Sequence, residues 1–274
     1  MAISLEGSLN RKNISAFADC AHFDEIYIRD QDTITVDLAK MLLPLRSVFK
    51  MTLWCGVTRA AMRHVISRPN LNELVVFELK PFGSLSGFKD ANSLAYFSCV
   101  CGLTETDLLE LAKCRSLERL GAQQACISER ALEALLELPL LTEIDFEDSN
   151  FNDNHARLIA KSKTITKLNV GQSHITKYGL RKICSMKQLK GLDIWSNNIE
   201  ESDLDLLSEL PNLEYLSIGG SDEQTKFTAK GTIPKLEKIS SLKHLWLDGL
   251  RVTDDEWAYL NERYEEVKLA VIHM

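Results

Sequence analysis

The sequence has no hydrophobic run long enough to cross a membrane, since none approaches about 18 consecutive apolar residues. Its first residues, MAISLEGSLNRKN, also lack the basic segment followed by an apolar segment that marks a signal peptide. The seven cysteines are odd in number and scattered along the chain, so they do not outline a disulfide framework. Free thiols are typical of a reducing compartment, and we therefore expect a cytoplasmic protein with no membrane contact.

The sequence also lacks an excess of positive charge. It has 32 lysines and arginines against 39 aspartates and glutamates, which gives a net charge of −7. A phosphate backbone needs a basic surface, so this balance argues against a nucleic-acid partner. The same balance is compatible with a basic protein partner, or with solubility alone.

Familiar catalytic motifs are missing as well. There is no phosphate-binding loop and no glycine fingerprint for a dinucleotide. The segment GSLSG (residues 83–87) is not a nucleophile elbow, which needs single-residue spacers around its serine. We expect no catalytic residues, no cofactor and no enzyme activity.

What the sequence does contain is one pattern written many times. The clearest copy has apolar residues in steps of three, two, five, five, three and three: Leu189, Leu192, Ile194, Ile199, Leu204, Leu207 and Leu210. Copies in the same phase begin at Leu117, Leu141, Ile165 and Leu242. Looser copies begin at Phe23, Val48, Leu71, Leu94 and Leu213. A fixed period of about 24 residues indicates a stack of identical structural units.

Each unit combines two periodicities. Its front, apolar-x-x-apolar-x-apolar, is typical of a short strand, and its back has the i, i+3 spacing of a helix. Good N-cap residues stand between them in four copies: Ser128, Asn152, Thr176 and Thr253. In the clearest copy that position is Glu200, and we expect Ser202 with Asp205 to cap the helix two residues later.

The pattern resembles the leucine-rich-repeat family, from Phe23 to Val271. The match LKGLDIWSNNI (residues 189–199) includes Asn197, whose side chain satisfies backbone groups of the turn in such repeats. Four neighbouring copies depart from the family at this position: Ala125, Ser149, Ser173 and Ser221. The resemblance implies an α/β fold, a right-handed solenoid or horseshoe, with about 10–11 parallel strands on the concave side and helices on the convex side. It also implies protein binding on the concave face more than catalysis.

The domain organisation follows from the repeat boundaries. We expect residues 1–22 to be an N-terminal cap, residues 23–266 to form the repeats as a single domain, and residues 267–274 to form a capping strand. One copy is longer, with an insertion near residues 220–234. Insertions in a solenoid emerge as loops and often bind partners, so Phe227 is a candidate contact. A tolerated surface loop is the alternative.

The cysteines Cys99 and Cys101, with Cys114 and Cys126 downstream, suggest a zinc site at first sight. The repeat places Cys99 in the core, Cys101 just after the strand and Cys114 in the helix region of its unit, so the thiols do not converge. We therefore interpret them as small apolar residues, and expect no metal.

Residues that flank the buried strand positions project from the concave sheet. Large aromatic residues fall there in two groups: Trp195, Tyr215 and Trp246, and a second patch of Trp54, Phe77 and Tyr96. Acidic and polar residues share the face with the first group: Glu143, Asp145, Glu147, Asp193, His244 and Asp248. Exposed aromatic residues are enriched in binding hot spots. Cross-strand packing that stiffens the sheet, or cover by an N-terminal segment, is the alternative explanation.

These observations favour a protein-recognition module that binds a partner on its concave face. Within that class, the acidity suggests an inhibitor or immunity-type protein that neutralises a basic enzyme. The competing hypothesis is a structural protein that self-assembles through the same aromatic residues.

Overall fold

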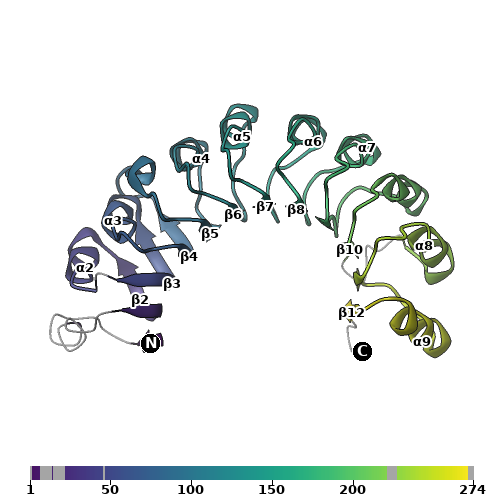
Figure 1. Ribbon diagram of the computed structural model, residues 1–274, viewed down its shortest axis with the longest axis horizontal. Coiled ribbons are helices and arrows are strands. Elements are labelled where there is room, and N and C mark those ends of the chain that lie inside the picture. Colours follow the sequence, from purple (N-terminus) through teal and green to yellow (C-terminus); the bar gives the residue numbers. More distant parts are fainter. Residues whose placement is uncertain (1, 7–13, 15–21, 46, 221–226, 271–274) are drawn as a thin grey trace. The chain divides into compact units, whose positions relative to one another are not determined.

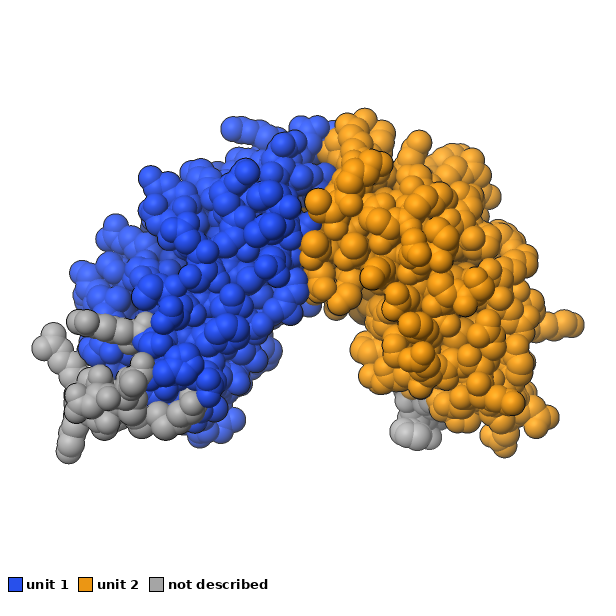
Figure 2. All heavy atoms as spheres, viewed as in Figure 1, with its two compact units in different colours: residues 1–141 blue, residues 142–274 orange. Residues whose placement is uncertain are grey.

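The computed structural model describes residues 2–6, 14, 22–45, 47–220 and 227–270. Contacts within the chain group it into two compact units, Met1–Leu141 (unit 1) and Thr142–Met274 (unit 2), which Figure 2 distinguishes by colour. The longest described helix has 10 residues, and none of the described helices has the length and hydrophobicity needed to cross a bilayer.

Unit 1 is a parallel sheet in which every strand pairs with the next strand along the chain. Its helices all lie on one side of that sheet (Figure 1). The elements are β1 (Ala2–Leu5), β2 (Phe23–Ile34), α2 (Val36–Met41), β3 (Val48–Thr58), α3 (Arg59–Val65), β4 (Glu73–Lys80), η1 (Phe88–Asp90), β5 (Tyr96–Cys101), α4 (Glu105–Leu111), β6 (Arg119–Ala122) and α5 (Glu129–Leu136).

Unit 2 repeats the same plan, again with parallel pairing in chain order and helices on one side (Figure 1). Its elements are β7 (Glu143–Asp145), α6 (Asp153–Ile159), β8 (Lys167–Asn169), α7 (Lys177–Ile183), β9 (Gly191–Asp193), η2 (Glu201–Glu209), β10 (Tyr215–Gly219), α8 (Ala229–Leu236), β11 (His244–Asp248), α9 (Asp254–Arg263) and β12 (Glu266–Ala270). We call the side of each sheet that the helices leave uncovered its open face.

The apolar positions of the repeat form the core between sheet and helices. Leu192, Leu216 and Leu245 are neighbours in register on β9, β10 and β11, and each is fully buried. A buried leucine of this kind stabilises the fold by about 1.5–3 kcal/mol. The predicted α/β architecture of parallel strands and helices is therefore confirmed.

The described residues contain twelve strands, whereas the repeat predicted about 10–11. The additional strand is β1, which lies inside the segment expected only as a cap and pairs with β2. It buries Leu5 and covers the backbone groups of β2, which would otherwise be an open edge. Its sequence, AISL, carries only the last two apolar positions of the front of a repeat, Ile3 and Leu5, so the sequence pattern did not predict it.

The helix starts agree with the sequence in four copies, where Ser128, Asn152, Thr176 and Thr253 are the N-caps. The expectation for the clearest copy was wrong. There Glu200 itself is the N-cap, and the carboxylate of Asp203 accepts a hydrogen bond from the Glu200 N–H at 3.1 Å. The element that follows, η2, is a 3-10 helix of nine residues.

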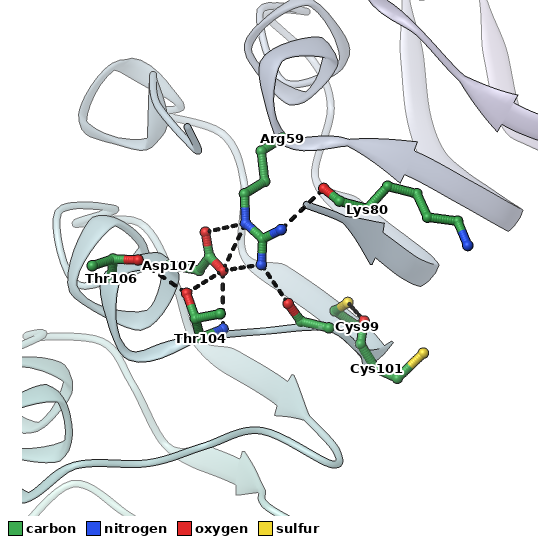
Figure 3. A network of polar contacts seen from close by, with 8 residues as sticks. Arg59, Lys80, Cys99, Cys101, Thr104, Thr106 and Asp107 are labelled. Carbon is green, nitrogen blue, oxygen red and sulfur yellow. Dashed lines mark hydrogen bonds and ion pairs between the residues drawn. The ribbon is translucent and has the colours of Figure 1, made fainter. Parts of the chain in front are cut away.

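Arg59 of unit 1 bridges the repeat between β4 and β5, in which the 3-10 helix η1 stands in place of an α-helix. Figure 3 shows the guanidinium of Arg59, from the start of α3, against the carboxylate of Asp107 in α4, with an Nη2–Oδ2 distance of 2.7 Å. The same guanidinium donates to the carbonyl oxygens of Lys80 at 3.0 Å and Gly102 at 2.6 Å. Asp107 also accepts from the Thr104 N–H at 2.9 Å, so this buried charge pair is well supplied with hydrogen bonds.

The pKa of Asp107 is set by two opposing effects, burial and hydrogen bonding. Burial acts to raise the pKa, but hydrogen bonds from Arg59 and Thr104 outweigh burial and lower it. The ionised carboxylate is therefore the form that stabilises this repeat.

We predict that Asp107→Asn lowers the free energy of unfolding by about 3 kcal/mol, because it leaves Arg59 buried without its counter-charge. Denaturant unfolding followed by circular dichroism measures the change. Lys113→Met is the matched control, since Lys113 pairs with Glu110 at the surface and its loss should cost less than about 1 kcal/mol. Equal effects of the two substitutions would contradict a special role for the Arg59–Asp107 pair.

Candidate functional site

The three aromatic residues of the first predicted group lie on the open face of unit 2. Tyr215 and Trp246 belong to β10 and β11, and Trp195 follows β9 by two residues. All three side chains are half-buried, whereas the leucines behind them are fully buried. The rings are therefore not part of the leucine core, in keeping with the outward direction that the repeat predicts.

Tyr215 and Trp246 contact each other edge to face, with ring centroids 5.5 Å apart. The ammonium of Lys268, from β12, lies 4.3 Å from the centroid of the Trp246 ring. The indole Nε1 of Trp246 is buried and has no hydrogen-bond partner among the described residues. The ring face of Trp246 is thus a place that already accepts a cation.

Trp195 leans to the other side, over Gly171 of the preceding repeat. A Cβ atom at Gly171 would overlap the Nε1 and Cδ1 atoms of the indole, so only glycine permits this position. The Trp195 carbonyl accepts hydrogen bonds from the Gln172 N–H at 2.7 Å and from the Asn197 side chain at 3.3 Å. Backbone and side-chain contacts together fix where the indole lies.

Asn197 performs the role that the resemblance implied. Its Oδ1 accepts from the Ile175 N–H at 2.8 Å, and its Nδ2 donates to the Val170 carbonyl at 2.8 Å. Ser149 and Ser173, at the same position of earlier repeats, hydrogen-bond to residues two positions away in their own turns. Ser221 lies outside the described residues. One asparagine therefore ties together the turns on which Trp195 stands.

A set of carboxylates shares the face with these rings. The pKa of Asp193 is raised to about 7, mainly by burial and also by the charges of Glu147 and Asp145, against the hydrogen bonds from the Trp195 N–H and Ser217, which lower it. Burial also raises the pKa of Asp248, again with a contribution from Glu147. The charge of Glu147 thus raises the pKa of both Asp193 and Asp248, so the protonation states of these carboxylates are linked.

The remaining predicted residues of unit 2 have partners close by. Glu143 pairs with Lys167 of the next strand at 2.8 Å. Asp145 accepts from the Glu147 N–H at 2.9 Å. His244 lies 3.7 Å from Glu266, on the neighbouring strand.

The second predicted patch, in unit 1, is only partly assembled. Trp54 and Phe77 contact each other with centroids 5.0 Å apart, and their exposed fractions are 49% and 37%. Tyr96 does not join them, because it pairs in register with Glu73, four residues before Phe77. Its ring is instead covered by the guanidinium of Arg119 at 4.4 Å.

The insertion of unit 2 is described only at its end, since residues 221–226 lie outside the described residues. Phe227 is half-buried. The next residue, Thr228, donates from its N–H and its hydroxyl to Glu201, at 2.6 and 2.9 Å. Phe227 as a partner contact stays a prediction.

Cys99 lies in the core on β5 as the repeat predicts, whereas Cys114 follows the end of α4 by three residues. Cys99 and Cys114 are buried, and burial raises the pKa of the Cys99 thiol to about 12. Cys126 is exposed, and Cys101 is half-buried. Within the described part of the chain, no group of three or more histidine, cysteine or acidic residues is placed to hold a metal ion.

Three contributors to this face are not among the predicted residues: Gly171, Ser217 and Lys268. Lys268 could be predicted from the repeat, because β12 continues the register and places Lys268 opposite Trp246. Ser217 and Gly171 have no signal of their own in the sequence, since their value lies in being small.

We predict that Asp193→Asn stabilises the protein at high pH. The folded pKa of about 7 lies above the ordinary value of 3.8, so stability falls as the pH rises between these values. Thermal unfolding at pH 8 should show a gain of about 1–3 kcal/mol, with a smaller gain at pH 5. The control Asp255→Asn, in the exposed first turn of α9, should give no pH-dependent gain. A loss of stability at pH 8 would contradict the burial of an ionised carboxylate.

Comparison with known proteins gives structural matches but no sequence matches. No known family model and no curated protein sequence matches the chain. An internalin from Listeria monocytogenes is similar in structure, with a TM-score of 0.55 at 18% identity over 85% of this chain and 69% of that one.

Two receptors are similar as well. The structure of a TLR13–ssRNA13 complex matches with a TM-score of 0.56 at 19% identity, over 89% of this chain and 35% of that one. A TDR receptor matches with a TM-score of 0.55 at 14% identity, over 93% of this chain and 44% of that one. The chain thus spans less than half the length of either receptor. These matches, together with the strand–turn–helix units described above, show that the chain has the leucine-rich-repeat fold.

Proposed function

We propose that this protein is a recognition module that binds a protein partner, without catalysis, on the open face of unit 2. The observation that carries the proposal is the gathering of Trp195, Tyr215 and Trp246 on consecutive repeats outside the filled core. Aromatic side chains that are half-exposed offer a partner large apolar area at a small entropic cost. The neighbouring carboxylates supply orientation.

A protein suits this face better than a nucleic acid. Glu147 and Asp248 present negative charge beside the rings, and Asp193 adds to it above its pKa of about 7, so a phosphate backbone would be repelled. The similar receptor TLR13 is in complex with ssRNA13 in its own structure. The charge on the open face of unit 2 does not support carrying that ligand over to this chain.

The cysteines support action in a reducing compartment such as the cytoplasm. The described cysteines are all free, including the exposed Cys126. Thiols persist in that state where glutathione and thioredoxin keep them reduced.

We predict that Trp195→Ala combined with Trp246→Ala keeps the far-ultraviolet circular dichroism spectrum but reduces partner capture from native lysate at least tenfold. Both rings lie outside the core, so their loss should remove binding area rather than the fold. Tyr178→Ala is the matched control, because Tyr178 is 75% exposed on the helix side of unit 2. Capture that survives in the double variant would discard this site, and would move attention to Trp54 and Phe77 in unit 1.

The alternative function is self-assembly through the same aromatic residues. Sedimentation of the purified protein over a concentration range distinguishes the two functions. A mass that stays at one chain supports recognition of another protein. A mass that rises with concentration, and that the double variant abolishes, supports self-assembly.

The inhibitor or immunity-type function is a sharper form of the leading proposal. It is supported by the net charge of −7 and by the carboxylates beside the rings. A basic enzyme would be attracted to this face before contact.

We predict that association with the captured partner slows at least tenfold between about 50 and 500 mM NaCl, because salt screens long-range attraction. Dissociation should change much less. Surface plasmon resonance measures both rates. An association rate that is indifferent to salt would contradict the basic-enzyme form of the proposal, and would leave the aromatic contact in place.

A further inference from the structure

The sheet of unit 2 ends in an edge strand. Among the described strands, β12 is the last of the sheet and pairs with β11 alone. The N–H of Glu266 donates to the carbonyl oxygen of Lys243, the residue before β11, at 3.3 Å. Backbone groups of successive residues in a strand point to opposite sides, so the N–H and C=O of Val267 and Leu269 point away from β11. They form a row with which a further strand can pair.

The apolar core is also incompletely covered at this edge. Leu245 and Leu247 of β11 are buried, whereas their neighbours in register on β12, Val267 and Leu269, are only half-buried. Trp257 of α9 is 36% exposed. The last three residues line an open groove of about 490 Å³, which is completed by Trp246, Asp248 and Lys268.

The side of α9 that is turned away from α8 is exposed as well. Tyr259 hydrogen-bonds to Glu237 at the end of α8, so the Tyr259 side of α9 faces α8. Asp254, Trp257 and Asn261 share the opposite side by their i, i+3 and i+7 spacing, and all three are exposed. Strand edge, core and helix are thus all open to a partner at the same end of unit 2.

The side chains of β12 are complementary in charge to a second copy of the same strand. Glu266 and Lys268 stand two residues apart on the open face, each about half exposed, and they contact each other along the strand at 3.1 Å. If a second β12 pairs antiparallel with Val267 opposite Val267, each Glu266 lies opposite the second copy's Lys268. Four charges of alternating sign then form a network, which is worth more than a single exposed pair.

The neighbouring registers are unfavourable. A register centred on Lys268 places two lysines directly opposite each other, and one centred on Glu266 does the same with two glutamates. Like charges in these positions are destabilising. In the register centred on Val267, the outward N–H and C=O of Val267 exchange two hydrogen bonds with their counterparts. Charge and backbone direction therefore select the same register.

We propose that two copies of this protein pair through β12 in antiparallel orientation, with Val267 at the two-fold axis and Glu266 of each copy opposite Lys268 of the other. A two-fold contact of this kind is closed, so assembly stops at two copies. The contact uses the free edge of β12 rather than the open face, and it is therefore separate from the proposed recognition function.

The first test is sedimentation equilibrium of the whole chain. The mass should rise from one chain to two as the concentration increases, and no further. Lys268→Glu places glutamates opposite each other and should weaken dimerisation at least tenfold, and Glu266→Lys should do the same with lysines. The combined variant Glu266→Lys/Lys268→Glu restores opposite charges at both positions. It should restore the dimer, which separates a lost contact from a lost fold.

Disulfide cross-linking tests the register. Glu266→Cys and Lys268→Cys are prepared separately, both with Cys126→Ser, which removes an exposed native thiol. In the proposed register their Cα atoms are about 4.5 Å apart across the two copies, within reach of a disulfide. On oxidation, a mixture of the two variants should form covalent dimers at least tenfold faster than either variant alone.

Trp195→Ala is the control for the contact surface. Trp195 lies on the open face, so its loss should leave the β12 dimer unchanged. This result distinguishes the dimer from self-assembly through the aromatic residues.

Several outcomes would overturn the inference. A mass of one chain at every concentration would do so, and so would masses beyond two chains, which would indicate head-to-tail pairing of β12 with β1. A combined charge variant that fails to restore the dimer would reject the register, as would rapid cross-linking of Lys268→Cys alone. A dimer that Trp195→Ala abolishes would assign the contact to the open face instead.

Discussion

The alternation of side chains along each strand is the constraint on which the rest of this structure depends. Leu192, Leu216 and Leu245 must point into the core of unit 2, because that burial holds one repeat against the next. The residues next to them on each strand therefore point to the opposite face, away from the helices. A shift of one residue would bury Asp193 and Trp246 and expose the leucines, so the core and the candidate binding face are specified together.

A buried aspartate in unit 1 and a partly buried aspartate in unit 2 have opposite surroundings. In unit 1, Arg59 and Asp107 are buried, and their polar atoms are hydrogen-bonded to each other, to carbonyl oxygens and to Thr104. In unit 2, Asp193 is held in a position that raises its pKa, and no lysine or arginine of the described residues pairs with it. Proteins tend to break their own local rules where function requires it. We interpret the cost to stability at Asp193 as consistent with the proposed binding of a partner at this face.

Much of this arrangement could be predicted from the sequence, because it follows from a repeat. The strand positions, the helix starts at Ser128 and Thr176, the turn asparagine Asn197 and the outward direction of Trp195 and Trp246 all derive from phase alone. The position of a residue within the repeat predicts which face of the sheet its side chain is on. It does not predict which side chains of neighbouring strands contact each other.

The features that sequence analysis missed are those that depend on such meetings. Tyr96 shares a face with Phe77 but lies under Arg119, at a different height along the strand. The helix in the clearest copy begins at Glu200, with Asp203 completing the cap, and not two residues later at Ser202 with Asp205. The lack of an ion pair at Asp193 within the described strands is a property of several strands together, so no single repeat reveals it.

The proposed binding face contains an Asp193 carboxylate that is partly buried and has no lysine or arginine partner among the described residues. Carbon-13 NMR titration of the aspartate carboxyl groups, with Asp193→Asn to identify the signal, tests this state most directly. We expect Asp193 in the free protein to titrate near pH 7. Titration at the ordinary aspartate value, near 3.8, would contradict this expectation, because the carboxylate would then be solvated or paired within the chain.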